Sequence, residues 1–274
     1  MNDDQNDASS VSATPHVPDV LAGVRLGRVL GVGGMGRVYH GRHPILDIDV
    51  AIKVLHPERG DEDRFLTEAR LAARVQHDRV VRILHAGIEE GCRFLILEYV
   101  DGRTLKQVVE ERGRLPWREA LHLALQAAEG LAAAHRLGIV HRDIKPSNFL
   151  LDGQGRVKLA DLGVARSMLG SSDITAAGDV VGTVAYMAPE QVEDAPAVTP
   201  AADVYALGAT LGYLLSGLTP QRLRKAGGLR QVQGDIPQTV AALVQRMMAD
   251  EPWDRPSDGA AVVGELERLL GLGT

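Results

Sequence analysis

The sequence predicts an α+β fold in two lobes, a small antiparallel β lobe followed by a larger lobe made mainly of helices. Between residues 26 and 99, apolar residues fall in short runs rich in β-branched side chains, separated by Gly, Pro and charged turns. After residue 99, apolar residues recur at helical spacing over longer stretches. The chain has 274 residues and 45% hydrophobic content, enough to bury one large core or the cores of two lobes.

Five apolar runs predict the strands of the small lobe, and we expect them to form one antiparallel sheet. These runs cover residues 25–32, 37–42, 50–55, 80–87 and 93–100. One helix interrupts them at residues 61–76, where apolar side chains recur at helical spacing behind an acidic first turn. The small lobe is therefore expected to hold five strands and a single helix.

The larger lobe begins with the strongest predicted helix, at residues 115–138, with Pro116 near its start and Gly138 as its stop signal. Two short strands and a long loop rich in Gly, Ser and Thr follow. Further helices are then predicted at residues 201–216, 237–250 and 257–270. The strands cover residues 149–152 and 156–160.

The ends of the domain follow from changes in composition. Residues 1–22 are acidic, polar and interrupted by Pro, without a positive start or an apolar run, so we expect a disordered tail and no secretory signal. The folded domain is expected over residues 23–272. Its small lobe covers residues 23–98, the linker or hinge residues 98–102, and the large lobe residues 103–272. Ligands tend to bind where two lobes meet.

Charge and cysteine content exclude several classes of function. The net charge is −6, from 30 Lys and Arg against 36 Asp and Glu, so no basic field favours nucleic acid as a partner. Cys92 is the one cysteine, which excludes a disulfide framework and a cysteine-rich zinc site and favours the cytoplasm. Residues 204–220 are uncharged but shorter than the roughly 20 apolar residues of a membrane span. We therefore expect a buried helix there and no membrane span.

The segment GVGGMGRV, residues 31–38, has glycines at 31, 33 and 36 in a G-x-G-x-x-G-x-V pattern. Glycines let backbone amides approach a polyphosphate where a Cβ would collide with it. Taken alone, such a match is also an ordinary hairpin turn. A dinucleotide-binding fold would require a helix after the glycines, whereas a predicted strand follows them. The pattern favours a flap over phosphates.

The predicted strand at residues 50–55, VAIKVL, carries Lys53 between apolar neighbours. A lysine in a strand is most often a solvated edge charge, but a charge in so apolar a strand requires a partner. Glu68, on the side of the following helix that should face the sheet, is the predicted partner. A Lys53–Glu68 pair would hold the ammonium near ligand phosphates. The alternative is two unrelated surface charges.

A charged cluster lies in the apolar segment IVHRDIKPSNFLLDGQG, residues 139–155. Asp143 could accept a proton from an incoming hydroxyl, and Lys145 could neutralise a phosphoryl group during its transfer. Asn148 and Asp161 offer oxygens to Mg²⁺, which binds through one or two carboxylates together with phosphate oxygens. Each residue alone fits a capped turn or a hydrophilic loop. All of them in this order favour phosphoryl transfer.

Across roughly residues 26–270 the sequence resembles a eukaryotic-type serine/threonine protein kinase of the kind common in bacteria. The shared motifs are highly specific in combination. They are GVGGMGRV, VAIK, HRDIKPSN, DLG and APE. The resemblance implies the bilobal protein kinase fold and a non-specific serine/threonine kinase of EC 2.7.11.1 type. Such an enzyme transfers the γ-phosphoryl group of ATP to Ser or Thr of proteins with the help of Mg²⁺, or alternatively Mn²⁺. The KPSN segment resembles Ser/Thr rather than Tyr specificity.

The resemblance also implies roles for individual residues. Asp143 is then the catalytic base, Lys145 contacts the γ phosphate, Lys53 with Glu68 holds the α and β phosphates, and Asn148 and Asp161 ligate the metal. Residues implied to line the nucleotide are Leu30, Gly31, Val32, Gly33, Gly34, Met35, Gly36, Val38, Ala51, Lys53, Leu97, Glu98 and Val100. Among these, Leu97 resembles the gatekeeper, while the Glu98 carbonyl and the Val100 backbone would bind adenine.

Outside the nucleotide site, Asp203 resembles the residue that anchors the catalytic loop, and Glu190 and Arg255 resemble a structural buried ion pair. Arg142 resembles the arginine that pairs with a phosphate on the activation loop, so activation by autophosphorylation within a transient homodimer is expected. Thr175 is the first choice for that phosphate. Thr183 instead resembles the threonine that contacts the catalytic Asp and Lys.

The sequence disfavours two other classes of function. A pseudokinase that binds nucleotide and signals by shape is disfavoured because every chemical position is present. A small-molecule phosphotransferase of the same lobed fold is disfavoured because GTVAYMAPEQ resembles the peptide platform of protein kinases. The polar segment after Gly217 departs from the family pattern, which puts the usual helix there in doubt.

Overall fold

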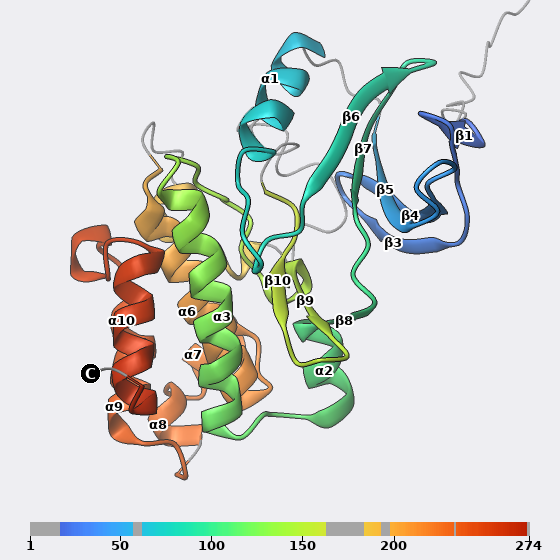
Figure 1. Ribbon diagram of the computed structural model, residues 1–274. Helices are drawn as coiled ribbons and strands as arrows, with labels where there is room; N and C mark the ends of the chain where they lie inside the picture. The colour runs from blue at the N-terminus through green and yellow to red at the C-terminus, as the bar shows by residue number, and fades with distance from the viewer. Residues whose placement is uncertain (1–16, 57–61, 163–183, 193–197, 233, 273–274) are drawn as a thin grey trace, which may run out of the picture.

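The computed structural model describes residues 17–56, 62–162, 184–192, 198–232 and 234–272. A small lobe of strands, with one helix beside it, lies above a larger lobe of helices (Figure 1). The predicted α+β organisation in two lobes is confirmed.

The small lobe is built on a five-stranded antiparallel sheet in the order β3-β4-β5-β7-β6. The strands are β3 (Val29–Gly33), β4 (Gly36–Arg42), β5 (Asp49–Leu55), β6 (Ile83–Glu89) and β7 (Cys92–Glu98). Helix α1 (Glu62–Ala72) lies beside the sheet and ends four residues before the predicted position 76. The five predicted strands are all present, and their bounds differ from the prediction by a few residues.

A short hairpin precedes the sheet and was not predicted. It joins β1 (Val20–Leu21) to β2 (Val24–Arg25), so the folded chain begins before residue 23, where we expected the tail to end. Leu21 and Val24 are fully buried and pack against the side chains of β5 and β7 on the back of the sheet. This apolar contact holds residues that composition alone assigned to a tail.

The apolar run of β5 is explained by burial on both faces of the sheet. Val50, Ile52 and Val54 point into the core beneath the β1–β2 hairpin. Ala51 and Leu55, on the opposite face because side chains alternate along a strand, join the main core that continues into the large lobe. Lys53 has the same parity as Ala51 and Leu55, so its ammonium is directed toward the large lobe.

A small antiparallel sheet and a bundle of helices form the large lobe. The sheet has the order β10-β9-β8 and contains β8 (Gly102–Thr104), β9 (Phe149–Asp152) and β10 (Val157–Leu159). The longer helices are α2 (Leu105–Arg112), α3 (Trp117–His135), α6 (Pro200–Ser216), α9 (Gln238–Met247) and α10 (Gly259–Leu270). The short ones are η1 (Pro146–Asn148), α5 (Pro189–Val192), α7 (Pro220–Lys225), α8 (Leu229–Val232) and η3 (Pro252–Asp254).

The sequence did not predict β8 or α2. Thr104 explains why α2 starts where it does, because its side chain accepts a hydrogen bond from the Gln107 amide while the Gln107 side chain accepts one from the Thr104 amide. The segment after Gly217, whose helix was in doubt, contains the short helices α7 and α8.

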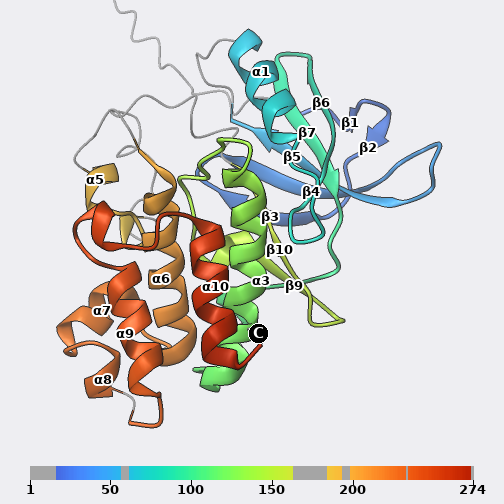
Figure 2. The same ribbon diagram turned by 60° about the vertical axis from the view of Figure 1, so that its left-hand side comes forward.

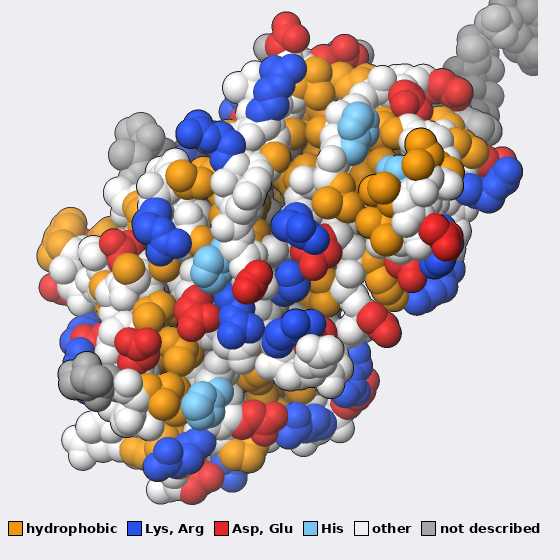
Figure 3. Space-filling view, in the orientation of Figure 1, with side chains coloured by type: hydrophobic (Ala, Val, Ile, Leu, Met, Phe, Trp, Pro, Cys, Tyr) orange, Lys and Arg blue, Asp and Glu red, His pale blue; other side chains and the backbone are white. Residues whose placement is uncertain are grey.

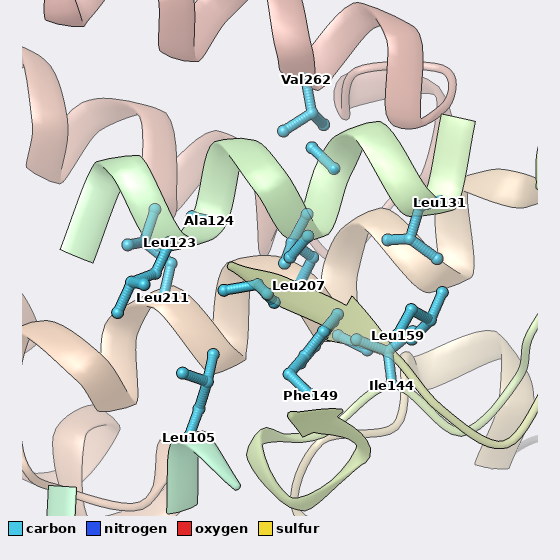
Figure 4. Packing of buried hydrophobic residues seen from close by; sticks show 14 of the residues in the cluster. Leu105, Leu123, Ala124, Leu131, Ile144, Phe149, Leu159, Leu207, Leu211 and Val262 are labelled. Atoms are coloured by element: carbon cyan, nitrogen blue, oxygen red, sulfur yellow. The ribbon is translucent and has the colours of Figure 1, made fainter. Parts of the chain in front are cut away.

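Helix α3 is the centre of the large lobe, with α6 on one side and α10 on another (Figures 1 and 2). Leu123 of α3 lies beside Leu211 of α6, and Leu131 and Leu207 belong to the same apolar core (Figure 4). Gly259 begins α10 so close to α3 that an added Cβ would lie 2.5 Å from the Ala132 nitrogen. Phe149 and Leu159 of the small sheet are fully buried in the same core, which therefore extends from the helices to the region between the lobes.

Within the described residues, no helix is long and apolar enough to cross a membrane. On the face drawn in Figure 3, Lys and Arg side chains alternate with Asp and Glu side chains across the large lobe. The large lobe contains surface ion pairs such as Arg112–Glu119 and Arg246–Glu265.

We expect Leu131→Ala to lower the free energy of unfolding by about 2 to 5 kcal/mol, because Leu131 is fully buried and its removal leaves a cavity in the core. Leu137, which is 42% exposed, provides the matched control, and Leu137→Ala should cost no more than about 0.5 kcal/mol. Urea unfolding of both variants measures the difference. Equal losses would contradict the burial described for α3.

Candidate active site

The loop of residues 141–148 is held from below by the buried carboxylate of Asp203 on α6. The Asp203 oxygens accept hydrogen bonds from the His141 amide at 2.7 Å and the Arg142 amide at 2.8 Å. Arg142 has a φ of +64°, a left-handed conformation that costs energy for a residue other than glycine. The bonds to Asp203 stabilise this conformation, so the loop keeps one shape beneath the site.

Sequence reasoning missed His135, at the end of α3. Its Nδ1 accepts a hydrogen bond from the Gly259 amide and its Nε2 donates one to Asp203, each at 3.0 Å. Because Nδ1 is an acceptor, the proton of the neutral ring lies on Nε2. The ring therefore connects the start of α10 to the carboxylate that holds the loop. The sequence offers one signal, a histidine in the last turn of a mainly apolar helix.

Asp143 and its neighbours form the centre of the site. Lys145 Nζ lies 3.1 Å from Asp143 Oδ2. The Asn148 side-chain amide donates hydrogen bonds to the Asp143 carbonyl at 2.7 Å and to Asp143 Oδ2 at 3.1 Å. Asp143 and Asn148 are buried, so the carboxylate is held in one orientation by a cation and an amide. The structure thus brings together the three residues that the sequence singled out in this loop.

Asn148 and Asp161 fit a magnesium ion that is held partly by phosphate oxygens. Both hydrogen bonds of Asn148 to Asp143 use its nitrogen, which leaves Oδ1 for a cation. Asp161 follows β10, and its φ of +62° turns the chain sharply at that point. The described residues contain no group of three or more His, Cys, Asp or Glu that could hold a metal by themselves. A two-ligand site of oxygen donors matches the preference of Mg²⁺ for keeping water or phosphate in its coordination sphere.

Lys53 reaches across from the small lobe to Asp161. Its Nζ lies 2.8 Å from Asp161 Oδ1, and the lysine side chain is 8% exposed. Burial alone would raise the pKa of Asp161, but the charge of Lys53 and its hydrogen bond outweigh burial, so the pKa of this carboxyl lies below its ordinary value. Asp161 is therefore an anion at neutral pH and can serve as a metal ligand.

The predicted partner of Lys53 was Glu68, and this structure contains a different ion pair. Lys53 pairs with Asp161, while Glu68 Oε1 accepts a hydrogen bond from Arg64 Nε at 3.1 Å. Arg64 and Glu68 lie one turn apart on α1, so they can pair without any contact between α1 and the sheet. We expected a partner across the two elements and did not expect the arginine on the same helix to take Glu68.

The glycines of the β3–β4 hairpin are explained by different physical reasons. Gly36 has a φ of +146°, and a Cβ there would lie 2.0 Å from the Val54 carbonyl oxygen, so packing against β5 requires this glycine. A Cβ at Gly31 or Gly33 would meet nothing within 4 Å. Packing in the structure does not explain these two glycines, whereas a ligand that approaches the backbone closely would. Val32 and Gly34, between and beside them, are exposed.

The remaining residues expected to line a nucleotide share one apolar surface. They pack in or against the main core on the side of the sheet that faces the large lobe, and they are Leu30, Val38, Ala51, Leu97 and Val100. Ala51 is the cross-strand partner of Leu97, and Val38 is that of Lys53. Met35 lies in the hairpin turn and is half-buried. An apolar surface beside a lysine suits a planar base attached to phosphates.

Glu190 and Arg255 form a buried bidentate ion pair below the site, with N–O distances of 2.7 and 2.9 Å. The remaining donors of the Arg255 guanidinium bind the carbonyl oxygens of Ala249, Asp250 and Ala201. No part of the Arg255 side chain is exposed. Full satisfaction of its donors explains how a charge can be buried there.

The candidate regulatory threonines, Thr175 and Thr183, lie outside the described residues. The side chain of Arg142 is exposed, and the Arg142 carbonyl accepts a hydrogen bond from the Gln191 side chain at 3.1 Å. Gln191 also accepts one from the Ala188 amide, so residues 188–191 are tied directly to the loop that carries Asp143.

Comparison with known proteins gives one family. Residues 24–264 match the family model described as the protein kinase domain. The serine/threonine-protein kinase PknK of Mycobacterium tuberculosis is 38% identical, with 97% of this chain aligned to 25% of that protein. PknL of the same species is 37% identical over 86% of this chain and 63% of that protein. PrkC of Bacillus subtilis is 37% identical over 83% of this chain and 37% of that protein. The chain thus spans from about a quarter to less than two thirds of these relatives.

Among solved structures, the crystal structure of Rad53 1-466 in complex with AMP-PNP is similar in fold, with a TM-score of 0.72. The match covers 88% of this chain and 64% of that chain at 20% sequence identity.

Removing Arg255 leaves Glu190 as a buried carboxylate without its cation, so Arg255→Met should lower the free energy of unfolding by about 3 to 5 kcal/mol. Arg268→Met is the matched control, because the Arg268–Glu265 pair has a 69% exposed arginine side chain and should contribute less than about 1 kcal/mol. Chemical unfolding of both variants checks this. A loss for Arg255→Met no larger than for Arg268→Met would show that the buried pair is not structural.

Proposed function

Because the chain belongs to the protein kinase family, we propose that it is a serine/threonine kinase that transfers the γ-phosphoryl group of ATP to hydroxyls of proteins. The observation that carries this proposal is the arrangement of Asp143, which is buried, oriented by Asn148 and paired with Lys145 at 3.1 Å. The related proteins named serine/threonine-protein kinases support the same activity.

In the proposed mechanism the residues of the chain position the reactants and neutralise charge, and they carry out little covalent chemistry. Asp143 accepts the proton of the attacking hydroxyl, because its carboxylate is an oriented acceptor beside the space that a substrate would enter. Lys145 neutralises negative charge next to Asp143, and Lys53 does so from the small lobe. Bound Mg²⁺, or alternatively Mn²⁺, would supply further charge neutralisation at the phosphates. Asn148 and Asp161 would hold this ion.

The nucleotide is proposed to lie against the apolar surface of Leu30, Val38, Ala51 and Leu97, beneath the β3–β4 hairpin. The linker of residues 98–102 would hold its base through backbone groups of Glu98 and Val100. The proposed catalytic domain then comprises the small lobe, which includes the hairpin starting at Val20, and a large lobe of residues 103–272. Cytoplasmic localisation, protein substrates and a transient homodimer for autophosphorylation are parts of the same proposal.

The two rival functions have less support. A pseudokinase would lack one of the chemical positions, whereas Lys53, Asp143, Asn148 and Asp161 are all present in the sequence. Lys53 is paired with Asp161, and Asn148 is bonded to Asp143. A small-molecule phosphotransferase has no need of a peptide platform. Here the hydrogen bonds of Gln191 join residues 188–191 to the catalytic loop.

Lys53→Met should reduce autophosphorylation and phosphorylation of a general Ser/Thr protein substrate by orders of magnitude, from a turnover of roughly 1 to 100 per second in the activated enzyme. The reason is the loss of the one ammonium that the small lobe directs at the site. Lys225→Met, at an exposed position on α7, should leave both rates unchanged. Labelled ATP measures both. Normal turnover of the Lys53→Met protein would remove this lysine from the mechanism.

We expect Thr175 to carry the activating phosphate, because a phosphothreonine there would supply the anion that the exposed Arg142 side chain can bind. Phosphopeptide mass mapping of the wild-type protein should find Thr175 modified. The Asp143→Asn protein, which lacks the proposed base, should be unmodified at that position. Absence of phosphate at Thr175 in both proteins would refute the assignment.

A further inference from the structure

A second ion pair, between Glu98 and Lys158, connects the two lobes at the hinge. Its charges are reversed relative to Lys53–Asp161, because the small lobe supplies the acid and the large lobe supplies the base. Glu98 Oε1, at the end of β7, lies 2.8 Å from Lys158 Nζ on β10. Both side chains are largely buried, 20% and 14% exposed. The other oxygen of Glu98 accepts a hydrogen bond from the Arg82 amide at 3.3 Å. Burial alone would raise the pKa of Glu98, but the hydrogen bonds from Lys158 and the Arg82 amide outweigh it and lower this pKa.

The same strand of the large lobe is bonded along its backbone to the segment before β6. The Leu159 amide donates to the Arg79 carbonyl at 2.8 Å, and the Val81 amide donates to the Leu159 carbonyl at 2.9 Å. Arg79 is in turn fastened to α3 through Glu129, at 2.9 Å. Two kinds of contact therefore hold β10 to the small lobe: the Glu98–Lys158 ion pair and the backbone hydrogen bonds of residues 79–81 with Leu159. We call these contacts together the seam.

The two interlobe ion pairs differ in what a ligand would do to them. In each pair one side chain comes from the small-lobe sheet and the other from β10 or the residue two positions beyond it, with the charges reversed: Lys53 with Asp161, and Glu98 with Lys158. This step rests on the proposed function, in which Lys53 and Asp161 bind phosphates and metal. A ligand then competes with the first pair. The side chains of Glu98 and Lys158 are not proposed to bind the ligand, so the ligand does not compete with the second pair.

We propose that Glu98 and Lys158 are positioning residues, whose ion pair holds the two lobes at the separation that nucleotide binding requires once Lys53 and Asp161 are engaged by the ligand. Nucleotide contacts residues of both lobes. Without this ion pair, only a fraction of the molecules has the lobe separation that nucleotide binding requires. The apparent affinity for nucleotide then falls by that fraction. Transfer itself starts from the bound, closed state, so the maximal rate should change little.

The first experiment uses the nucleotide-free protein and does not depend on its activity. Hydrogen–deuterium exchange should show the amides of Val81 and Leu159 exchanging roughly tenfold faster in Lys158→Met, which corresponds to about 1.4 kcal/mol of local stability. Lys106→Met is the matched control, because Lys106 pairs with Glu110 on the exposed surface of α2. It should leave both amides unchanged. Unchanged exchange in a folded Lys158→Met protein would overturn the proposal.

The second experiment measures nucleotide affinity by calorimetry and steady-state kinetics with varied ATP. Lys158→Met should weaken binding and raise KM for ATP roughly tenfold, while kcat stays within about twofold. Lys158→Arg keeps the charge and should restore KM. Glu98→Gln should reproduce the effect from the other partner, and it serves as the second variant if Lys158→Met does not fold. Glu98→Gln also weakens the pair with the Arg82 guanidinium, whose Nε lies 3.5 Å from Glu98 Oε2. The double variant should therefore bind no more weakly than Glu98→Gln alone, because that variant has already lost the contact with Lys158.

The outcomes separate this proposal from the proposed function. A wild-type protein that binds no nucleotide would refute the proposed function, and the exchange experiment would still decide whether the seam depends on Lys158. A wild-type protein that binds ATP, with unchanged KM in both Lys158→Met and Glu98→Gln, would refute the positioning role alone. A fall in kcat at constant KM would also refute it.

Discussion

The candidate active site depends on one carboxylate buried at the start of an apolar helix. Asp203 is 1% exposed and accepts hydrogen bonds from the two backbone amides that shape the catalytic loop. A buried anion is tolerated because those amides and the His135 ring satisfy its oxygens. This support stabilises the left-handed conformation of Arg142, while Asn148 and Lys145 hold the Asp143 carboxylate. Helix α6, which is almost entirely buried, therefore carries in its first turn the charged residue that supports the loop, and its burial makes the position of that carboxylate rigid.

Above this rigid base, the two lobes share an apolar core and are also joined by contacts that are charged and directional. Lys53–Asp161 lies inside the site, Glu98–Lys158 lies at the hinge, and hydrogen bonds between backbone groups join residues 79–81 to Leu159. Apolar burial is non-directional, so the shared core alone does not fix the angle between the lobes. Ion pairs and ladder bonds have narrow geometry, so they restrict how the lobes can approach one another. In the proposed function, the large lobe supplies Asp143, and these contacts restrict where the small lobe places Lys53.

Sequence reasoning reached the fold and the loop residues because both carry strong patterns. The helices of the large lobe have long apolar periodicity, and HRDIKPSN places three functional side chains within a few positions of one another. Side-chain pairings between different elements were harder to predict from the sequence. Glu68 was the predicted partner of Lys53, but the contact that forms depends on the position of α1, which local spacing does not give. The spacing of Arg64 and Glu68, one turn apart on α1, was the local signal that went unused. His135 was missed for a similar reason, since its partners lie on α6 and α10. The β1–β2 hairpin was missed because strands of two residues carry no periodicity.

The hairpin at the start of the fold has a practical consequence for handling the protein. Leu21 and Val24 cover the back of the sheet, where Ile52, Phe94 and Ile96 form an apolar surface. A shortened chain that began at Leu26 would leave this surface in contact with water. Exposed apolar sheet faces promote self-association. Poor solubility of such a shortened protein would then reflect an uncovered sheet and would say nothing about the catalytic loop on the other side of the molecule.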